Sequence, residues 1–159
     1  MRFRIGFGYD IHRLEAGYEL WLGGVKIPSE KGLVGHSDAD VLIHSICDAL
    51  LGAASMGDIG FHFPDTSEEF RNISSCILLQ RVMHLLKEKK FSIGNVDLTL
   101  VLESPKISEY IPEMIKILSA ILEVNDSDVS VKATTAEKLG YIGKEEGIES
   151  YAVALIQSE

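Results

Sequence analysis

The chain has 159 residues, of which 46% are hydrophobic and 25% are charged. This length and composition predict one compact folded domain over residues 1–159 and are unlike those of a disordered chain. The formal net charge of -9 argues against general binding to nucleic acid or to an anionic membrane surface. Any phosphate group must therefore be held locally, by a metal ion, a few lysines or backbone N–H groups.

No segment predicts secretion or membrane insertion. No apolar run reaches the roughly 18 residues that a bilayer span needs, and the N-terminus leads straight into a strand pattern without a signal-peptide core. Cys47 and Cys76 lie in apolar helical patterns without metal-type spacing, which is typical of reduced thiols. We therefore expect a cytoplasmic protein.

The first half of the chain predicts a strand, a hairpin and a helix, separated by loops. In chain order these are strand 3–12, hairpin 18–27, loop 28–35, a helix that ends near residue 54, and an irregular stretch at 57–65. Gly23 and Gly24 supply the hairpin turn, and either Ser37 or Asp38 can cap the helix.

The second half alternates helices with strands. The predicted order is helix 74–90, strand 96–102, turn 105–108, helix 111–122, strand 129–134, loop 135–149 and strand 151–156. This alternation favours an α/β (α+β) fold, a two-layer sandwich of a mixed β-sheet with helices on one face. The other face of such a sheet must also be buried, and assembly into an oligomer is the economical way to do so.

The first predicted strand carries a pair of metal-ligating side chains. Asp10 and His12 are two residues apart, so an extended backbone points both to the same side. His44 lies on a polar stripe of the following helix rather than on its apolar side. Two imidazoles and one carboxylate suit a zinc ion and leave one position open for substrate or water. The alternative is a chance Asp-x-His pair and an ordinary helical histidine.

A second polar group follows the strand at 129–134. Thr134 and Thr135 can donate hydrogen bonds to phosphate oxygens, and Glu137 can hold a hard divalent cation that bridges phosphates. The same residues also fit a helix capping box with Thr134 as the cap. Both interpretations stay open from the residues alone.

Further residues have a ligand-binding and a plain structural interpretation. His36 can approach a phosphate at the helix N-terminus, or it is an ordinary loop histidine. Asp58, with Gly60, can accept ribose hydroxyls or merely stabilise a turn. Lys106, beside Pro105, can bind a phosphate, although a solvated loop lysine is the default.

Several motifs taken together resemble one known enzyme family. They are Gly-Tyr-Asp-Ile-His at 8–12, His-Ser-Asp-Ala-Asp-Val at 36–41, Asp-Ala-Leu-Leu-Gly-Ala-Ala at 48–54, Gly-Asp-Ile-Gly at 57–60, Phe-Pro-Asp-Thr at 63–66, Gly-Asn-Val-Asp at 94–97, Val-Lys-Ala-Thr-Thr-x-Glu-Lys-Leu-Gly at 131–140 and Gly-x-x-Glu-Gly-Ile at 143–148. In order and spacing they closely resemble the 2-C-methyl-D-erythritol 2,4-cyclodiphosphate synthase family, over essentially the whole chain.

The resemblance implies an enzyme of the non-mevalonate route to isoprenoids and a homotrimer with active sites between neighbouring subunits. In the family's reaction the 2-phosphate of 4-diphosphocytidyl-2-C-methyl-D-erythritol 2-phosphate attacks the β-phosphorus of the same molecule. CMP leaves as the cyclic diphosphate closes. Holding two anions together and neutralising their charge with cations would explain how an acidic protein handles such a substrate.

The resemblance also implies roles for individual residues. The metal ligands are Asp10, His12 and His44 for Zn2+ and Glu137 for Mg2+ or Mn2+ at the diphosphate. His36 and Thr135 resemble the catalytic pair that stabilises the transition state. The implied substrate contacts are Asp10, His12, His36, Ser37, Asp58, Gly60, Phe63, Pro64, Asp65, Thr66, Ser67, Pro105, Lys106, Thr134, Thr135, Glu137, Tyr141 and Lys144.

Two positions depart from the family pattern. Position 144 is Lys where many relatives have Arg, and position 141 is Tyr where Phe is common. In some members that arginine holds an isoprenoid diphosphate in an apolar central channel. Because lysine offers a point charge rather than a planar fork, such a partner stays an open expectation here. Packing is the alternative role for Tyr141 and Phe63.

Two other functions fit the same residues. A zinc phosphoesterase that uses a metal-bound hydroxide would release inorganic phosphate or a hydrolysed diphosphate. A trimeric binding module for isoprenoid diphosphates would use the metal only for structure.

Overall fold

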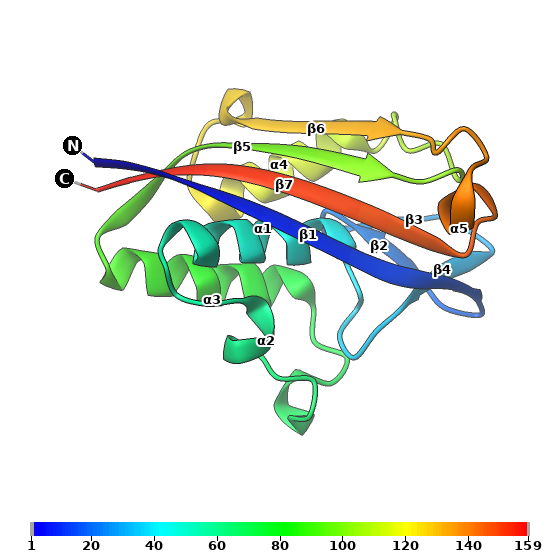
Figure 1. The fold of residues 1–159 in the computed structure, drawn as a ribbon, viewed down its shortest axis with the longest axis horizontal. Helices are drawn as coiled ribbons and strands as arrows, with labels where there is room; N and C mark the ends of the chain where they lie inside the picture. The colour runs from blue at the N-terminus through cyan, green and yellow to red at the C-terminus, as the bar shows by residue number, and fades with distance from the viewer. Residues whose placement is uncertain (1, 159) are drawn as a thin grey trace.

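The computed structural model describes residues 2–158, which form an α+β fold (Figure 1). The strands are β1 (Arg2–Ala16), β2 (Leu20–Leu22), β3 (Val25–Ile27), β4 (Lys31–Val34), β5 (Phe91–Val101), β6 (Val129–Thr134) and β7 (Gly147–Ser158). The helices are α1 (Val41–Ala53), α2 (Ile59–His62), α3 (Ser75–Glu88), α4 (Ile111–Leu122) and α5 (Gly140–Gly143), with short 3-10 turns at Glu68–Phe70 and Asp126–Asp128.

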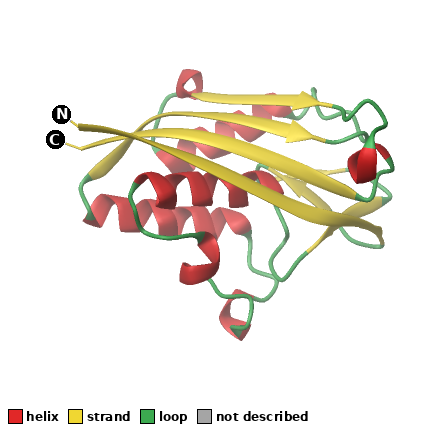
Figure 2. Cartoon of the chain, in the orientation of Figure 1, coloured by secondary structure: helices red, strands yellow, loops and turns green. Residues whose placement is uncertain are grey.

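Five strands form one mixed sheet in the order β4-β1-β7-β5-β6. All neighbours are antiparallel except β5 and β6, which run parallel. Helices α1, α3 and α4 gather on one side of this sheet, which confirms the expected mixed sheet with its helical layer (Figure 2). The predicted hairpin forms a separate two-stranded sheet, β2-β3. Gly23 and Gly24 in its turn have φ of 59° and 79°, where glycine is favoured.

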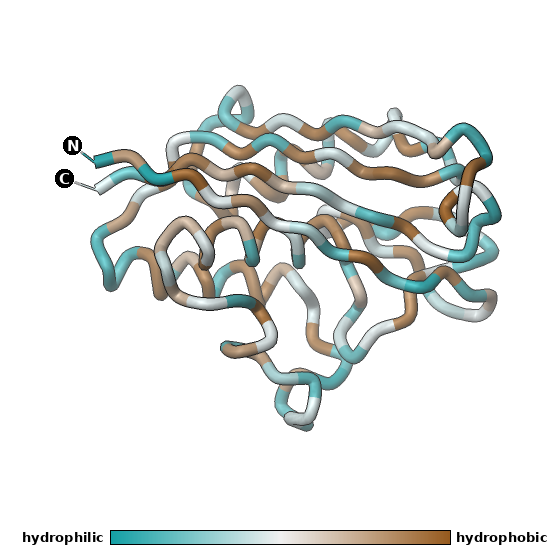
Figure 3. Tube along the Cα trace, in the orientation of Figure 1, coloured by the Kyte–Doolittle hydropathy of each residue, from teal (hydrophilic) through white to brown (hydrophobic). Residues whose placement is uncertain are grey.

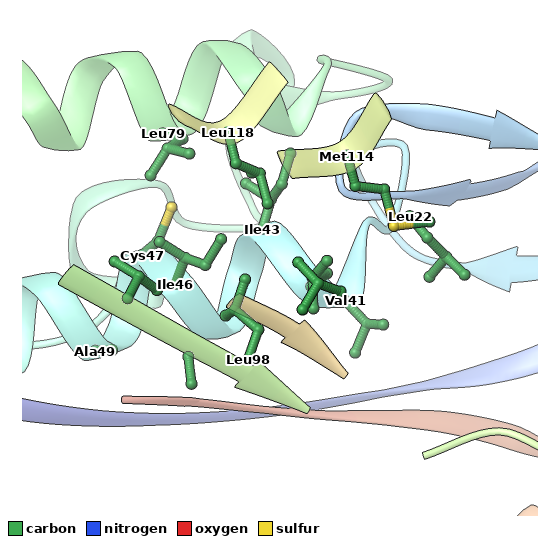
Figure 4. Close-up of a cluster of buried hydrophobic side chains, with 14 of the residues drawn as sticks. Leu22, Val41, Ile43, Ile46, Cys47, Ala49, Leu79, Leu98, Met114 and Leu118 are labelled. Carbon is green, nitrogen blue, oxygen red and sulfur yellow. The ribbon is translucent and has the colours of Figure 1, made fainter. Parts of the chain in front are cut away.

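The core lies between the sheet and the helices. Figure 4 shows side chains of α1 packed toward β5 on one side and toward α3 and α4 on the other. The labelled members are Leu22, Val41, Ile43, Ile46, Cys47, Ala49, Leu79, Leu98, Met114 and Leu118. Within the described residues, none of the helices combines the length and the apolar character that a membrane crossing needs.

Helix α1 lies directly against β1 because two glycines leave room for it. A Cβ on Gly8 would lie 1.9 Å from the carbonyl oxygen of Ser45, and one on Gly6 would lie 1.8 Å from that of Ala49. The helix backbone therefore occupies the space that strand side chains would fill. This close approach brings His44 of α1 to the β1 face that carries the predicted metal ligands.

The opposite face of the sheet is apolar and exposed. Phe3, Ile5 and Phe7 on β1 are 57%, 73% and 62% exposed, and Val153 on the neighbouring β7 is 44% exposed. Figure 3 shows hydrophobic positions recurring along both strands. Monomeric proteins rarely expose a contiguous apolar patch of this kind. This is the face that we expect an oligomer to cover.

Several predicted boundaries were wrong. Strands β1, β5 and β7 are longer than expected, and residues 59–62 of the stretch expected to be irregular form α2. Residues 31–34, expected in a loop, form β4 because they pair with residues 13–16 of β1. Helix α1 begins at Val41, later than expected, because Asp40 is its cap and accepts a hydrogen bond from Ile43 N–H at 3.1 Å. Residues 135–149, also expected in a loop, contain α5 and the first residues of β7.

Candidate functional site

Two residues of β1 and one residue of α1 converge on a common point. The Oδ2 atom of Asp10 lies 3.0 Å from Nε2 of His12 and 3.1 Å from Nδ1 of His44. These two imidazole nitrogens are themselves 3.1 Å apart, and all three ligand atoms lie within 4.8 Å of one another. Two nitrogens and one carboxylate oxygen in this arrangement fit a divalent cation of the zinc type. The predicted convergence of the three side chains is confirmed.

The outer ring nitrogens of both histidines have hydrogen-bond partners. Nδ1 of His12 lies 3.0 Å from the carbonyl oxygen of Val34, which can only accept, so Nδ1 carries the proton and the Nε2 lone pair faces Asp10. Nε2 of His44 lies 2.9 Å from Oγ of Ser75. Both rings are therefore held with one nitrogen turned toward the common point.

Asp38 supports His44 through Ser75. The hydroxyl of Ser75 donates to Oδ1 of Asp38, and the Ser75 N–H donates to Oδ2 at 2.9 Å. Because the hydroxyl proton is used in this way, the Ser75 oxygen accepts from Nε2–H of His44, and the Nδ1 lone pair faces inward. No local pattern marks Ser75, since the contact spans 37 positions of the chain.

Replacing Ser75 with alanine should weaken metal binding by roughly tenfold, as is typical when a partner of a ligating histidine is removed. The effect should not be larger, because Oγ of Ser37 stays 3.2 Å from the same His44 nitrogen. The backbone hydrogen bond to Asp38 would remain. Competition with a chromophoric chelator measures the affinity. Ser119→Ala is the matched control. Ser119 lies on α4, away from the metal ligands, and its hydroxyl likewise donates a hydrogen bond to a carboxylate, that of Asp126. Equal metal affinity in Ser75→Ala and the parent protein would exclude an orienting role for Ser75.

Burial and the two histidines act on Asp10 in opposite directions. Burial raises the pKa of its carboxyl group, but His12 and His44, when their rings are protonated on both nitrogens, donate hydrogen bonds and supply positive charge that outweigh this and lower the pKa to about 2. For His12, burial lowers the pKa of the imidazole. The Asp10 carboxylate outweighs that effect, so the pKa of His12 lies above its usual value. Asp10 is therefore ionised at neutral pH and suited to bind a cation.

The three ligand residues line a cavity of about 450 Å³. Other predicted substrate residues in its lining are His36, Ser37, Gly60, Phe63, Pro64 and Asp65. Asp58 supports this wall instead, because its Oδ1 caps α2 by accepting from Phe61 N–H at 2.8 Å. Asp48, which had no predicted role, accepts from Ile59 N–H at 2.8 Å and fixes α2 beside the cavity. Thr66 is exposed and lies outside this lining.

Four of the predicted substrate residues lie at a different cavity, of about 280 Å³. Pro105, Lys106, Thr134 and Thr135 all line it. No helix begins at Thr134, because β6 ends there and α5 starts only at Gly140. The capping-box interpretation of the threonines is therefore wrong.

The loop after β6 is shaped by two carboxylates. Oγ1 of Thr135 donates to Oε1 of Glu137 at 3.1 Å. Oε1 of Glu103 accepts from the N–H groups of Ala136 and Lys138 at 2.9 and 3.1 Å. Glu103 had no predicted role of its own, since its partners lie more than thirty positions away. The loop thus presents the Glu137 carboxylate and the Thr135 hydroxyl together.

The two cavities belong to separate parts of the chain and share no lining residue. Asp10 and His12 lie on β1, whereas Thr134 ends β6, and both β7 and β5 stand between these strands. At a strand spacing of about 4.8 Å, β1 and β6 are about 14 Å apart. One chain therefore places the predicted site residues at two separate cavities.

Tyr141 and Lys144 line neither of these two cavities. The Tyr141 hydroxyl donates to the carboxylate of Glu149, which also accepts from Tyr9 at 3.3 Å and from Tyr151 at 2.9 Å. Lys144 caps the C-terminus of α5 nearby. The Tyr141 hydroxyl thus belongs to a polar cluster around Glu149, so Tyr141 is not solely a packing residue.

The sequence and the fold both match those of known proteins. Residues 3–157 match the YgbB family. The chain belongs to the YgbB family. A relative from Phocaeicola vulgatus, named 2-C-methyl-D-erythritol 2,4-cyclodiphosphate synthase, is 58% identical to it over 99% of this chain and 98% of its own length. The resemblance stated from the motifs is confirmed.

Solved structures resemble the YgbB chain in fold. The bifunctional IspDF of Campylobacter jejuni matches 99% of it with a TM-score of 0.95 and 37% identity, and the match spans 43% of that longer chain. A CDP complex of IspF from Plasmodium falciparum matches with a TM-score of 0.86 and 40% identity, over 99% of this chain and 97% of its own.

Proposed function

We propose that this YgbB-family chain converts 4-diphosphocytidyl-2-C-methyl-D-erythritol 2-phosphate to 2-C-methyl-D-erythritol 2,4-cyclodiphosphate and CMP, in the cytoplasm, as one domain over residues 1–159. An oxygen of the 2-phosphate attacks the β-phosphorus, and the bond from that phosphorus to the bridging oxygen of CMP breaks. The observation that carries the proposal is the convergence of Asp10, His12 and His44 in a cavity bordered by His36. The name of the Phocaeicola relative and the CDP in the Plasmodium complex support the substrate class.

Two groups of residues would hold cations. Asp10, His12 and His44 would hold Zn2+, and Glu137 would hold Mg2+ or Mn2+ at the diphosphate. Bound divalent ions supply Lewis acidity and neutralise phosphate charge. The donor set of the first group, and the pairing of Glu137 with Thr135, support these assignments.

The chain's own side chains would bind and orient the substrate. A phosphate monoester is already a nucleophile near neutral pH, so the main task is to hold two anions together. His36 and Thr135 would stabilise the negative charge that grows in the transition state. The remaining contacts would be Ser37 to the 2-phosphate, Asp58 and Gly60 to ribose and erythritol, the mobile loop Phe63–Ser67 to the substrate, Pro105 and Lys106 to cytosine, and Thr134 to phosphate.

We infer a homotrimer in which the Asp10 cavity of one subunit faces the Thr134 cavity of its neighbour. The separation of the two half-sites within one chain supports this arrangement, as does the exposed apolar face of β1 and β7. Cyclic assembly brings unlike surfaces of neighbouring copies together, as such a site requires. We further propose that an isoprenoid diphosphate binds along this apolar face. The exposed ring of Phe7 and the positive charge of Lys144 would favour such a ligand. The carboxylate of Glu149, which accepts from Tyr141, would repel its diphosphate group.

Phosphorus NMR of the protein incubated with Mg2+ and the cytidyl substrate tests the proposal. We expect the signals of CMP and the cyclic diphosphate to appear together. Inorganic phosphate or an open diphosphate would instead indicate a zinc phosphoesterase. Retention of metal without any turnover would indicate a binding module.

Replacing Glu137 with glutamine should raise the Mg2+ concentration for half-maximal turnover by roughly tenfold, because an amide gives a hard cation no negative charge. A magnesium titration of CMP release measures this shift. Glu123→Gln is the matched control, since Glu123 is an exposed glutamate paired with Lys87. An unchanged titration in Glu137→Gln would contradict its role.

A further inference from the structure

One arginine ties the turn beside the Asp10 cavity to helix α3. Nη1 of Arg81 lies 2.6 Å from Oε1 of Glu69. Its guanidinium carbon also lies 5.4 Å from the centre of the Phe70 ring. Both partners belong to the Glu68–Phe70 turn. Arg81 therefore contacts this turn through an ion pair with Glu69 and a cation–π contact with Phe70.

The same turn presents the carbonyl group that contacts His36. The Ser67 carbonyl oxygen accepts from Phe70 N–H at 3.2 Å and from Nε2 of His36 at 3.0 Å. Because a carbonyl can only accept, Nε2 of His36 carries the proton in this arrangement. Displacement of the turn would remove the group that fixes the His36 ring.

The turn also builds part of the cavity wall. Phe70 is only 8% exposed, and its ring packs edge to face on Phe63 with centroids 5.4 Å apart. Both rings line the Asp10 cavity. After the turn, Asn72 N–H donates to the His36 carbonyl oxygen at 2.7 Å. His36 is therefore hydrogen-bonded to the residue before the turn, Ser67, and to a residue after it, Asn72.

Both contacts of Arg81 lie at the protein surface. Arg81 and Glu69 are 43% and 59% exposed, and exposed ion pairs and cation–π contacts are individually weak in water. The position of the turn therefore depends on the two contacts acting together.

We propose that Arg81 is a positioning residue, which holds the Glu68–Phe70 turn over the cavity and thereby keeps His36 oriented. This inference rests on the proposed function, in which His36 contacts the substrate. Arg71 offers a matched comparison, because it pairs with Glu68 at 3.3 Å within the same turn and makes no contact of this kind with α3.

The test compares Arg81→Gln with Arg71→Gln in the full-length protein. In Arg81→Gln, kcat should fall about tenfold because a misplaced group near the reacting atoms is costly, whereas KM should change less than about twofold. Arg81→Lys keeps the charge but not the planar fork and should lie between. Nitrogen NMR of His36 should show the Nε2-protonated ring in the parent protein and a tautomer mixture in Arg81→Gln. Arg71→Gln should match the parent in both measurements.

Parent-like kcat or parent-like His36 signals in Arg81→Gln would overturn the inference, as would an equal loss in Arg71→Gln. The NMR measurement needs no substrate. A parent protein that releases no CMP would therefore refute the proposed function, while the His36 signals would still report on Arg81 alone.

Discussion

Replacing His44 with alanine should empty the metal centre and abolish most of the turnover. His44 contributes one of the three ligand atoms that lie within 4.8 Å of one another, and alanine has no atom to replace it. A metal ion contributes several kcal/mol to phosphoryl transfer, so kcat/KM should drop by about a thousandfold. Plasma mass spectrometry of the purified protein gives the metal content, and CMP release gives the rate.

His84→Ala serves as the control for this experiment. His84 is an exposed histidine of α3 that lies 3.4 Å from Glu88. It should keep both metal and turnover. Normal metal content together with normal turnover in His44→Ala would refute the ligand assignment.

Subunits with different damaged half-sites should restore one another. A His44→Ala subunit lacks the metal half-site, and a Thr135→Ala/Glu137→Ala subunit lacks the phosphate half-site, so each alone should be nearly inactive. In a cyclic trimer that contains both kinds of subunit, about one site in three combines two intact halves, one from each subunit. Co-expression with two affinity tags and purification through both isolates the mixed trimers.

The expected activity of the mixed preparation is about a third of the parent value, because both mixed species that the two tags select have one intact site of three. Activity no higher than that of the single preparations, in species shown to contain both subunits, would place the whole site within one chain.

The elements that the sequence predicted best are those with strong local signals. Helix α4 has the predicted bounds, since Pro112 suits its first turn and apolar residues recur at helical spacing. Strand β6 also has its predicted bounds, because a short apolar run precedes the polar loop at Thr135. Asp10 and His12 share a face because they lie on one extended strand, and this too is a local property.

The features that were missed depend on contacts between distant parts of the chain. Strand β4 is defined by its pairing with β1, and its four residues show no alternation of their own. The supports supplied by Ser75 and Glu103 come from positions more than thirty residues from their partners. Such contacts leave no periodic pattern in the sequence.

The central claim is that the side chains of Asp10, His12 and His44 hold one cation at the reacting phosphates. Anomalous X-ray diffraction at the zinc edge, from crystals grown with Zn2+, tests this claim most directly. It should show a peak about 2.0 to 2.2 Å from Oδ2 of Asp10, Nε2 of His12 and Nδ1 of His44. Crystals of protein that releases CMP, but with no peak among these three atoms, would contradict it.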